Sequence, residues 1–159
     1  MDFGSYVDLV RSRLSAAGFQ LADEGALALY AGRREVKLTR FGVVETVVGV
    51  SVPRESATQD DLKELGRQVV EAALKRKTRI PRGLGSSLVV YPTLVVESGS
   101  PDLQRFVGAN VPKHWSLLEF PVVADLTAQS LLYLERTPFW GAAYYRKTRA
   151  EAHALLNSR

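Results

Sequence analysis

Apolar side chains recur three or four residues apart in several segments, which is the spacing of one buried face of a helix. Helices are predicted over residues 3–17, 58–77 and 101–110, and from residue 141 onward. Gly18 follows the first helix, where a left-handed cap is expected, and Thr58 and Ser100 are good N-terminal caps for the second and third. The buried stripe of the second helix comprises Leu62, Leu65, Val69 and Ala72.

Between these helices the pattern changes to alternation or to short runs of β-branched residues, which is typical of strands. Strands are predicted over residues 26–31, 34–40, 43–52, 87–97, 119–124 and 130–135. Gly32 and Arg33 predict a tight turn between the first two strands, and residues 126–129 predict the turn of a hairpin. Pro92 indicates that its strand lies at a sheet edge or contains a bulge, because proline cannot donate to a ladder.

The predicted order of elements is α-βββ-α-β-α-ββ-α. This order favours an α+β fold with a mixed, mostly antiparallel sheet of about six strands and flanking helices. No internal repeat or long linker divides residues 1–159, so a single domain is predicted.

The amino-acid composition excludes several classes of functional site. The chain has 159 residues, 46% of them hydrophobic, which is enough for a packed core. It contains no cysteine, which excludes disulfides, thiol catalysis and cysteine zinc sites, and it contains two histidines. No apolar run reaches the roughly 20 residues needed to span a bilayer, and no signal-like segment is seen. The sequence therefore predicts a soluble, cytoplasmic protein with no membrane partner and no resident cofactor.

The net charge of +4 is unevenly distributed. Basic residues cluster in 33–40, 75–82 and 146–149, around a mildly acidic centre. Such clusters are usually solvated surface, but an anionic partner is the alternative.

Glu35 and Lys37 stand two residues apart on a predicted strand, so their side chains project from the same face. A carboxylate can hold Mg²⁺ while a neighbouring lysine positions water for phosphodiester hydrolysis. This Glu-x-Lys pair and the order helix, three strands, helix, strand resemble the PD-(D/E)xK nuclease superfamily. That resemblance implies Mg²⁺ as cofactor and a second acid from the preceding strand, here Asp23 or Glu24. The alternative is an exposed ion pair on a polar strand face.

The segment 75–82 carries five basic residues and no acid, and glycines and serines follow it. Arg76, Arg79 and Arg82 are its candidate anion-binding residues, because arginine forms strong hydrogen bonds with phosphate. The segment predicts contact with a nucleic-acid backbone if it lies on the same face as Arg33 and Arg34. The alternative is an ordinary connection between a helix and a strand.

Aromatic residues gather between residues 137 and 145, in a chain that is only 9% aromatic. The candidates for an interaction surface are Phe139, Trp140, Tyr144 and Tyr145. Tryptophan and tyrosine are favoured where one edge of the ring is buried and the other is wet. The alternative is that these rings seal the last helix onto the sheet.

Since no catalytic constellation is strong, the leading hypothesis is a non-catalytic protein-binding or assembly module that binds a protein partner or self-associates, for instance as a homodimer. The order of elements loosely resembles small secretion-chaperone-like domains, which implies dimerisation and a polypeptide partner. The alternatives are the Mg²⁺-dependent nuclease built on Glu35 and Lys37, and nucleic-acid binding through the basic segment 75–82.

Overall fold

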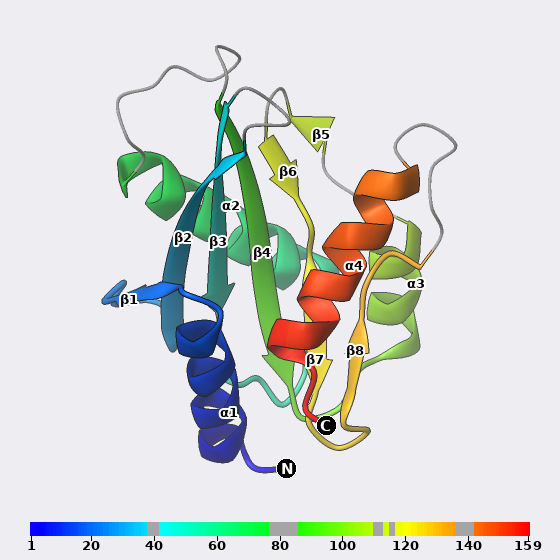
Figure 1. The fold of residues 1–159 in the computed structure, drawn as a ribbon. Coiled ribbons are helices and arrows are strands. Elements are labelled where there is room, and N and C mark those ends of the chain that lie inside the picture. The colour runs from blue at the N-terminus through cyan, green and yellow to red at the C-terminus, as the bar shows by residue number, and fades with distance from the viewer. Residues whose placement is uncertain (38–41, 77–85, 110–112, 115–116, 136–141) are drawn as a thin grey trace.

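The structure is a computed structural model that describes residues 1–37, 42–76, 86–109, 113–114, 117–135 and 142–159 (Figure 1). Its helices are α1 (Phe3–Ala16), α2 (Gln59–Arg76), α3 (Pro101–Ala109) and α4 (Ala142–Leu156). Its strands are β1 (Gln20–Ala22), β2 (Leu29–Lys37), β3 (Gly42–Val50), β4 (Ser86–Val96), β5 (Lys113–His114), β6 (Leu117–Glu119), β7 (Val122–Asp125) and β8 (Ser130–Leu132).

The strands form one mixed sheet in the order β1-β2-β3-β4-β6-β5, in which β7 also pairs with β4 and β8 pairs with β7. Antiparallel pairing joins β1 to β2, β2 to β3, β5 to β6 and β7 to β8. Parallel pairing joins β4 to β3, β6 and β7 in the middle of the sheet. The predicted α+β class, with a mixed and mostly antiparallel sheet, is confirmed.

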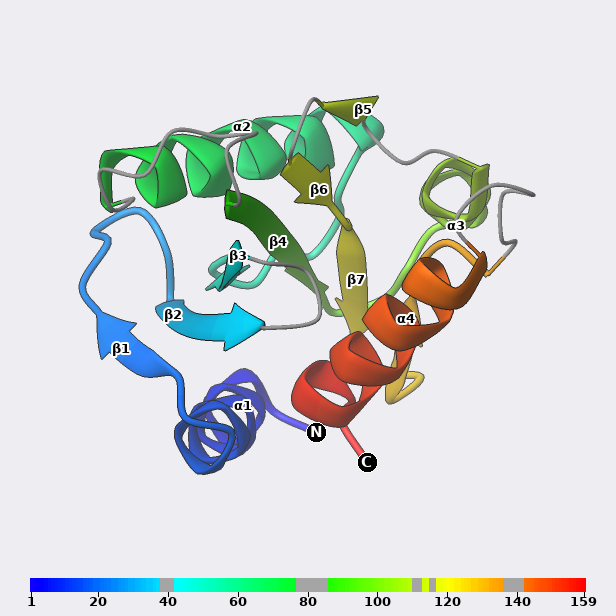
Figure 2. The ribbon, with the colours of Figure 1, turned by 45° about the horizontal axis from the view of Figure 1, so that its top comes forward.

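Helices cover both faces of this sheet (Figure 2). Residues of α1 and α4 pack on one face in a cluster that includes the fully buried Tyr6, Tyr91 and Phe120. Residues of α2 and α3 pack on the other face in a second cluster. The predicted stripe of α2 is confirmed, because all four of its side chains are buried there. Among the described residues, no helix is both long and apolar enough to cross a membrane.

The strand β2 runs without interruption through Gly32 and Arg33, so the turn predicted at these residues is wrong. Gly32 pairs with Gln20 of β1 on one side and with Val47 of β3 on the other, and these two ladders hold the segment extended. The two strands predicted on either side of Gly32 therefore form one strand. The first strand of the sheet is β1, whose three residues are too few to show an alternating pattern.

Pro92 lies in β4, an interior strand, so the expected edge position is wrong. Phe120 donates its amide to the Val90 carbonyl at 2.8 Å, which shows that even-numbered residues here direct their backbone groups toward β6 and β7. Pro92 has no N–H to donate on that side. The ladder is interrupted at this point: pairing with β6 ends at Val90, and pairing with β7 begins at Thr93.

The end of α1 matches its prediction. Gly18 adopts a φ of +79°, and its amide donates to the Ser15 carbonyl at 3.1 Å. Phe19 donates to the Leu14 carbonyl at 2.9 Å, which completes a Schellman motif. Leu14 and Phe19 are both buried in the first cluster, so the motif turns the chain from α1 directly into β1.

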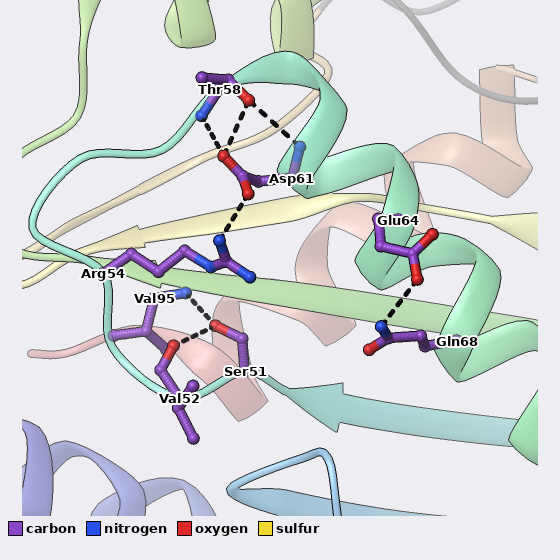
Figure 3. A network of polar contacts seen from close by, with 8 residues as sticks. All are labelled: Ser51, Val52, Arg54, Thr58, Asp61, Glu64, Gln68 and Val95. Atoms are coloured by element: carbon purple, nitrogen blue, oxygen red, sulfur yellow. Dashed lines mark hydrogen bonds and ion pairs between the residues drawn. The ribbon is translucent and has the colours of Figure 1, made fainter.

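The start of α2 is held by a reciprocal cap at Thr58, as predicted (Figure 3). The Thr58 amide and hydroxyl both donate to the Asp61 carboxylate at 2.8 Å, and Asp61 donates its amide to the Thr58 hydroxyl oxygen at 3.3 Å. These hydrogen bonds and the nearby Arg54 hold the pKa of Asp61 below its usual value. Glu64 and Gln68 form a second polar contact on the same helix.

Beneath this cap the chain leaving β3 is tied to β4 (Figure 3). The Ser51 hydroxyl oxygen accepts from the Val95 amide at 3.0 Å and its hydroxyl donates to the Val52 carbonyl at 2.8 Å. The segment that leads from β3 to α2 is therefore tied to the central strand.

Candidate functional site

Arg33 and Arg34 are neighbours on β2, so their side chains leave opposite faces of the sheet. Arg33 contacts α1 and α4, because it donates to the Ala17 carbonyl at 3.0 Å and to Glu151 at 2.6 Å. Arg34 lies on the opposite face of β2, where it lines a groove together with Ala73 and Arg76 of α2. One basic cluster of the sequence is thus divided between two environments.

On the face covered by α1 and α4, Arg33 is the centre of a polar network. Its guanidinium lies 2.6 Å from Glu151 and 3.4 Å from Glu35, and it stacks 4.6 Å from the centre of the Phe19 ring. The buried Tyr91 of β4 donates its hydroxyl to the other oxygen of Glu151 at 2.8 Å. The network links β2, β4 and α4. Only 18% of the Arg33 side chain is exposed, so the network is largely shielded from solvent.

Glu35 bears on the nuclease hypothesis. A second carboxylate, that of Glu151, lies near Glu35. Both carboxylates form ion pairs with Arg33, so the positive charge between them is a guanidinium. The part of the chain that the structure describes contains no group of three histidine or acidic residues that could hold a metal ion. The Lys37 side chain lies outside the described residues. The geometry around Glu35 is that of an ion-pair network.

The acids named as a second metal ligand are placed elsewhere. Glu24 lies 3.3 Å from Arg76 of α2, and Arg76 also donates to the Asp23 carbonyl at 2.7 Å. These contacts attach the chain after β1 to the end of α2. They do not bring Asp23 or Glu24 to Glu35, whose described ion pair is with Arg33 on the opposite face.

The groove on the α2 face has a volume of about 490 Å³ and lies between β1, β2, β3 and the last turns of α2. Its floor crosses three strands in register, from Gln20 through Gly32 to Val47. A Cβ added to Gly32 would have its nearest neighbours 4.0 Å away. Glycine weakens a strand interior, and here the space above it is open, as it is where a ligand or another chain approaches the backbone. The lining is Gly18, Gln20, Leu21, Ala22, Tyr30, Gly32, Arg33, Arg34, Glu45, Thr46, Val47, Ala73 and Arg76.

Charged groups stand at both ends of this groove. Arg34 is exposed and lies directly across from Glu45 of β3. Arg76 lies at the other end, 5.3 Å from the centre of the Tyr30 ring. Burial raises the pKa of Tyr30 to about 12; Arg76 opposes this rise, and the carboxylates of Glu24 and Glu45 add to it.

The two basic segments of the sequence thus meet. Arg34 belongs to the cluster 33–40 and Arg76 to the cluster 75–82, and both line the one groove. Arg79 and Arg82 lie outside the described residues, so the remainder of the second cluster is not placed.

The aromatic segment is described only in part. Phe139, Trp140 and the Tyr144 side chain lie outside the described residues. Tyr145 is 5% exposed and belongs to the cluster beneath α1 and α4, where burial raises the pKa of its hydroxyl. For this ring, the placement matches the alternative in which the aromatic residues seal the last helix onto the sheet.

Sequence reasoning did not single out Tyr30, Gly32 and Glu45 of the groove, or Tyr91 and Glu151 of the network. A turn predicted at Gly32 concealed the alternation of β2, which would have separated Arg33 from Arg34. Tyr91 and Glu151 carry no local signal, because 60 residues separate them and only the packing of α4 brings them together.

A comparison with protein-family models finds no match, and neither does a comparison with curated proteins or with solved structures. The likenesses to PD-(D/E)xK nucleases and to secretion chaperones therefore stay hypotheses drawn from the sequence.

Proposed function

We propose that this protein is a non-catalytic binding module and that it binds an anionic partner in the groove between β1–β3 and the end of α2. One observation carries the proposal: Arg34 and Arg76, which are 42 residues apart in the sequence, line the same open groove. Arginines that converge on a concave surface favour binding of carboxylates or phosphates, since guanidinium groups form charge-assisted hydrogen bonds with both.

The network on the other face supports a binding role over catalysis. Arg33 and Glu151 hold each other at 2.6 Å, and Tyr91 holds Glu151 at 2.8 Å. Because these groups bind one another, they link β2, β4 and α4 and are less available to a substrate than the groups that line the open groove. The groove contains arginines, a tyrosine and a glutamate, a set suited to recognition.

Titration with two labelled polyanions, polyglutamate and a short DNA duplex, tests the proposal. At low salt we expect at least one of them to bind and its affinity to fall as salt rises. In the double variant Arg34→Ala/Arg76→Ala we expect binding to weaken by at least about tenfold, since each hydrogen bond to a charged group contributes about 1.5–3 kcal/mol.

The matched control is Arg11→Ala/Arg105→Ala. These arginines pair with Asp8 and Asp102 on the exposed faces of α1 and α3, away from the groove. The control variant should bind like the unaltered protein. Equal loss in both double variants, or no binding of either polyanion at low salt, would show that the groove is not an anion site.

A second candidate function is contact with a nucleic-acid backbone, which one specific feature favours: the chain that leaves α2 at Arg76 carries three more basic residues by position 82. A protein of this kind prefers the duplex to polyglutamate and has a steep salt dependence.

The nuclease alternative is tested separately, by incubation with DNA and RNA in the presence and absence of Mg²⁺. Cleavage that requires Mg²⁺ and disappears in Glu35→Gln supports it. Cleavage that persists in Glu35→Gln comes from another source and rejects this assignment.

A further inference from the structure

The groove adjoins an open sheet edge. Among the described residues, β1 pairs with β2 alone and ends the order of the sheet. Half of the backbone N–H and C=O groups of an edge strand point outward and can pair with another extended chain. Leu21, in the middle of β1, is 44% exposed beside this edge.

Building on the proposed anion-binding function, we propose that the partner is an extended acidic segment of another protein, which adds to β1 as a further strand and directs two carboxylates into the groove. This is recognition by strand addition, in which backbone hydrogen bonds hold the peptide and alternate side chains determine specificity.

The positions of the two arginines define the spacing of those carboxylates. In the register of β1 with β2, the residue level with Arg34 is Gly18, just before β1. Arg76 is bound to Asp23, just after β1. The arginines therefore stand near opposite ends of a strand of three residues.

Side chains on one face of a strand recur every second residue, so residues four apart share a face and are about 13 Å apart. A peptide with acids at positions i and i+4 can thus direct both toward the α2 face, one to each arginine. The residue at i+2 would lie level with Gln20 and the uncovered Gly32, where a small side chain fits. The residues at i+1 and i+3 would lie on the opposite face with Leu21, where apolar side chains fit.

The charges in the groove favour a peptide over a nucleic acid. Glu45 lies across from Arg34, and Glu24 lies 3.3 Å from Arg76, so each cation has a carboxylate near it. A phosphodiester chain carries one negative charge per nucleotide and would bring phosphates close to these carboxylates. The Tyr30 ring, which could stack on a base, has Arg76 over it. A peptide can place single acids at the two cations and uncharged residues between them.

The experiment compares two labelled peptides of identical composition. One contains Glu-Val-Ala-Val-Glu, with its acids four residues apart; the other contains Glu-Val-Ala-Glu-Val, with its acids on opposite faces of a strand. The inference predicts that the first binds at least about tenfold more tightly, because only it can reach both arginines. Arg34→Ala and Arg76→Ala should each remove most of this preference, and Arg105→Ala should leave it unchanged.

Unfolding curves of each variant show whether the fold survives, and Arg34→Ala, at an exposed position, keeps the test valid if Arg76→Ala does not fold. Equal affinity for the two peptides overturns strand addition. Binding of the DNA duplex or of polyglutamate without preference for the first peptide overturns it too, while the anion-binding function stands. A dimer seen by sedimentation that the first peptide fails to dissociate assigns the edge to a second copy of this chain and overturns the inference. Failure of all the anionic probes to bind rejects both the inference and the proposed function.

Discussion

Arg33 and Arg34 are adjacent and chemically identical, and both border the groove, yet their side chains leave opposite faces of the sheet and have different surroundings. Arg33 is 18% exposed and is held by Glu151, Glu35 and the Ala17 carbonyl. Arg34 is exposed, and the groove that it lines is open. One face of β2 is covered by α1 and α4, whereas the other is left partly uncovered where α2 ends.

The difference teaches that the role of a basic residue follows from what covers its face of the sheet. A guanidinium that is largely buried and ion-paired within the chain, like that of Arg33, links elements of the fold. A guanidinium that faces an open groove is available for a partner. Substitutions can separate these two roles.

The largest effect is expected for Arg33→Ala. This substitution removes the cation that lies between Glu35 and Glu151. Because the partly buried carboxylate of Glu151 then loses the positive charge beside it, the free energy of unfolding should fall by about 3 kcal/mol. Arg34→Ala, at an exposed position, should cost less than about 0.5 kcal/mol. Urea denaturation of both variants measures the contrast, and equal losses would contradict it.

A second contrast separates two glycines that face α2. A Cβ at Gly49 would lie 2.4 Å from a Val69 methyl carbon, so Gly49→Ala should destabilise the protein by about 2 kcal/mol through overpacking. A Cβ at Gly32 would have its nearest neighbours 4.0 Å away, at ordinary van der Waals distance, so Gly32→Ala should be neutral within about 0.5 kcal/mol. Thermal and urea unfolding measure both, and a large loss in Gly32→Ala would show that the groove is closed in solution.

The hydroxyl of Tyr91 tests the network without removing its charges. Tyr91→Phe deletes the hydrogen bond to Glu151 and keeps the ring packed against Phe120. We expect a loss of about 1.5 kcal/mol, the value for a hydrogen bond to a charged group. The loss of unfolding free energy in the double variant Tyr91→Phe/Arg33→Ala should be smaller than the sum of the losses in the single variants. If it equals or exceeds that sum, the two residues do not act as one network.

The smallest effect concerns the ionisation of Tyr30 at alkaline pH. Its folded pKa is about 12, above the value of 10 for a free tyrosine, so the folded state keeps a proton that the unfolded state releases. Tyr30 therefore contributes stability below pH 10 that is lost as the pH rises toward 12. Arg76→Ala should raise the pKa of Tyr30 further, because it removes the positive charge over the ring.

Absorbance of tyrosinate against pH, corrected with Tyr30→Phe, measures this pKa. A pKa that falls in Arg76→Ala would mean that Arg76 does not lie over the ring in solution.

Several features of the fold could be predicted because their causes are local. Gly18 ends α1 since a left-handed φ favours glycine, and Thr58 begins α2 since its side chain accepts a hydrogen bond from an amide two or three residues on. The hairpin of β7 and β8 was also predicted, because its turn and both strands are contiguous in the sequence. The turn predicted at Gly32 is wrong, because glycine in the sequence is typical of turns and only its pairing with β1 and β3 shows that it lies inside a strand.

The sequence alone determined the class of the fold, the positions of the helices, the α2 stripe and the three basic clusters, since periodicity, caps and charge act over a few residues. Only the tertiary structure decided that Arg34 and Arg76 line one groove, that Arg33 is bound by Glu151, and that β4 lies inside the sheet despite Pro92. These facts depend on the packing of segments that are 29 or more residues apart, and a pattern of neighbouring side chains carries no information on that distance scale.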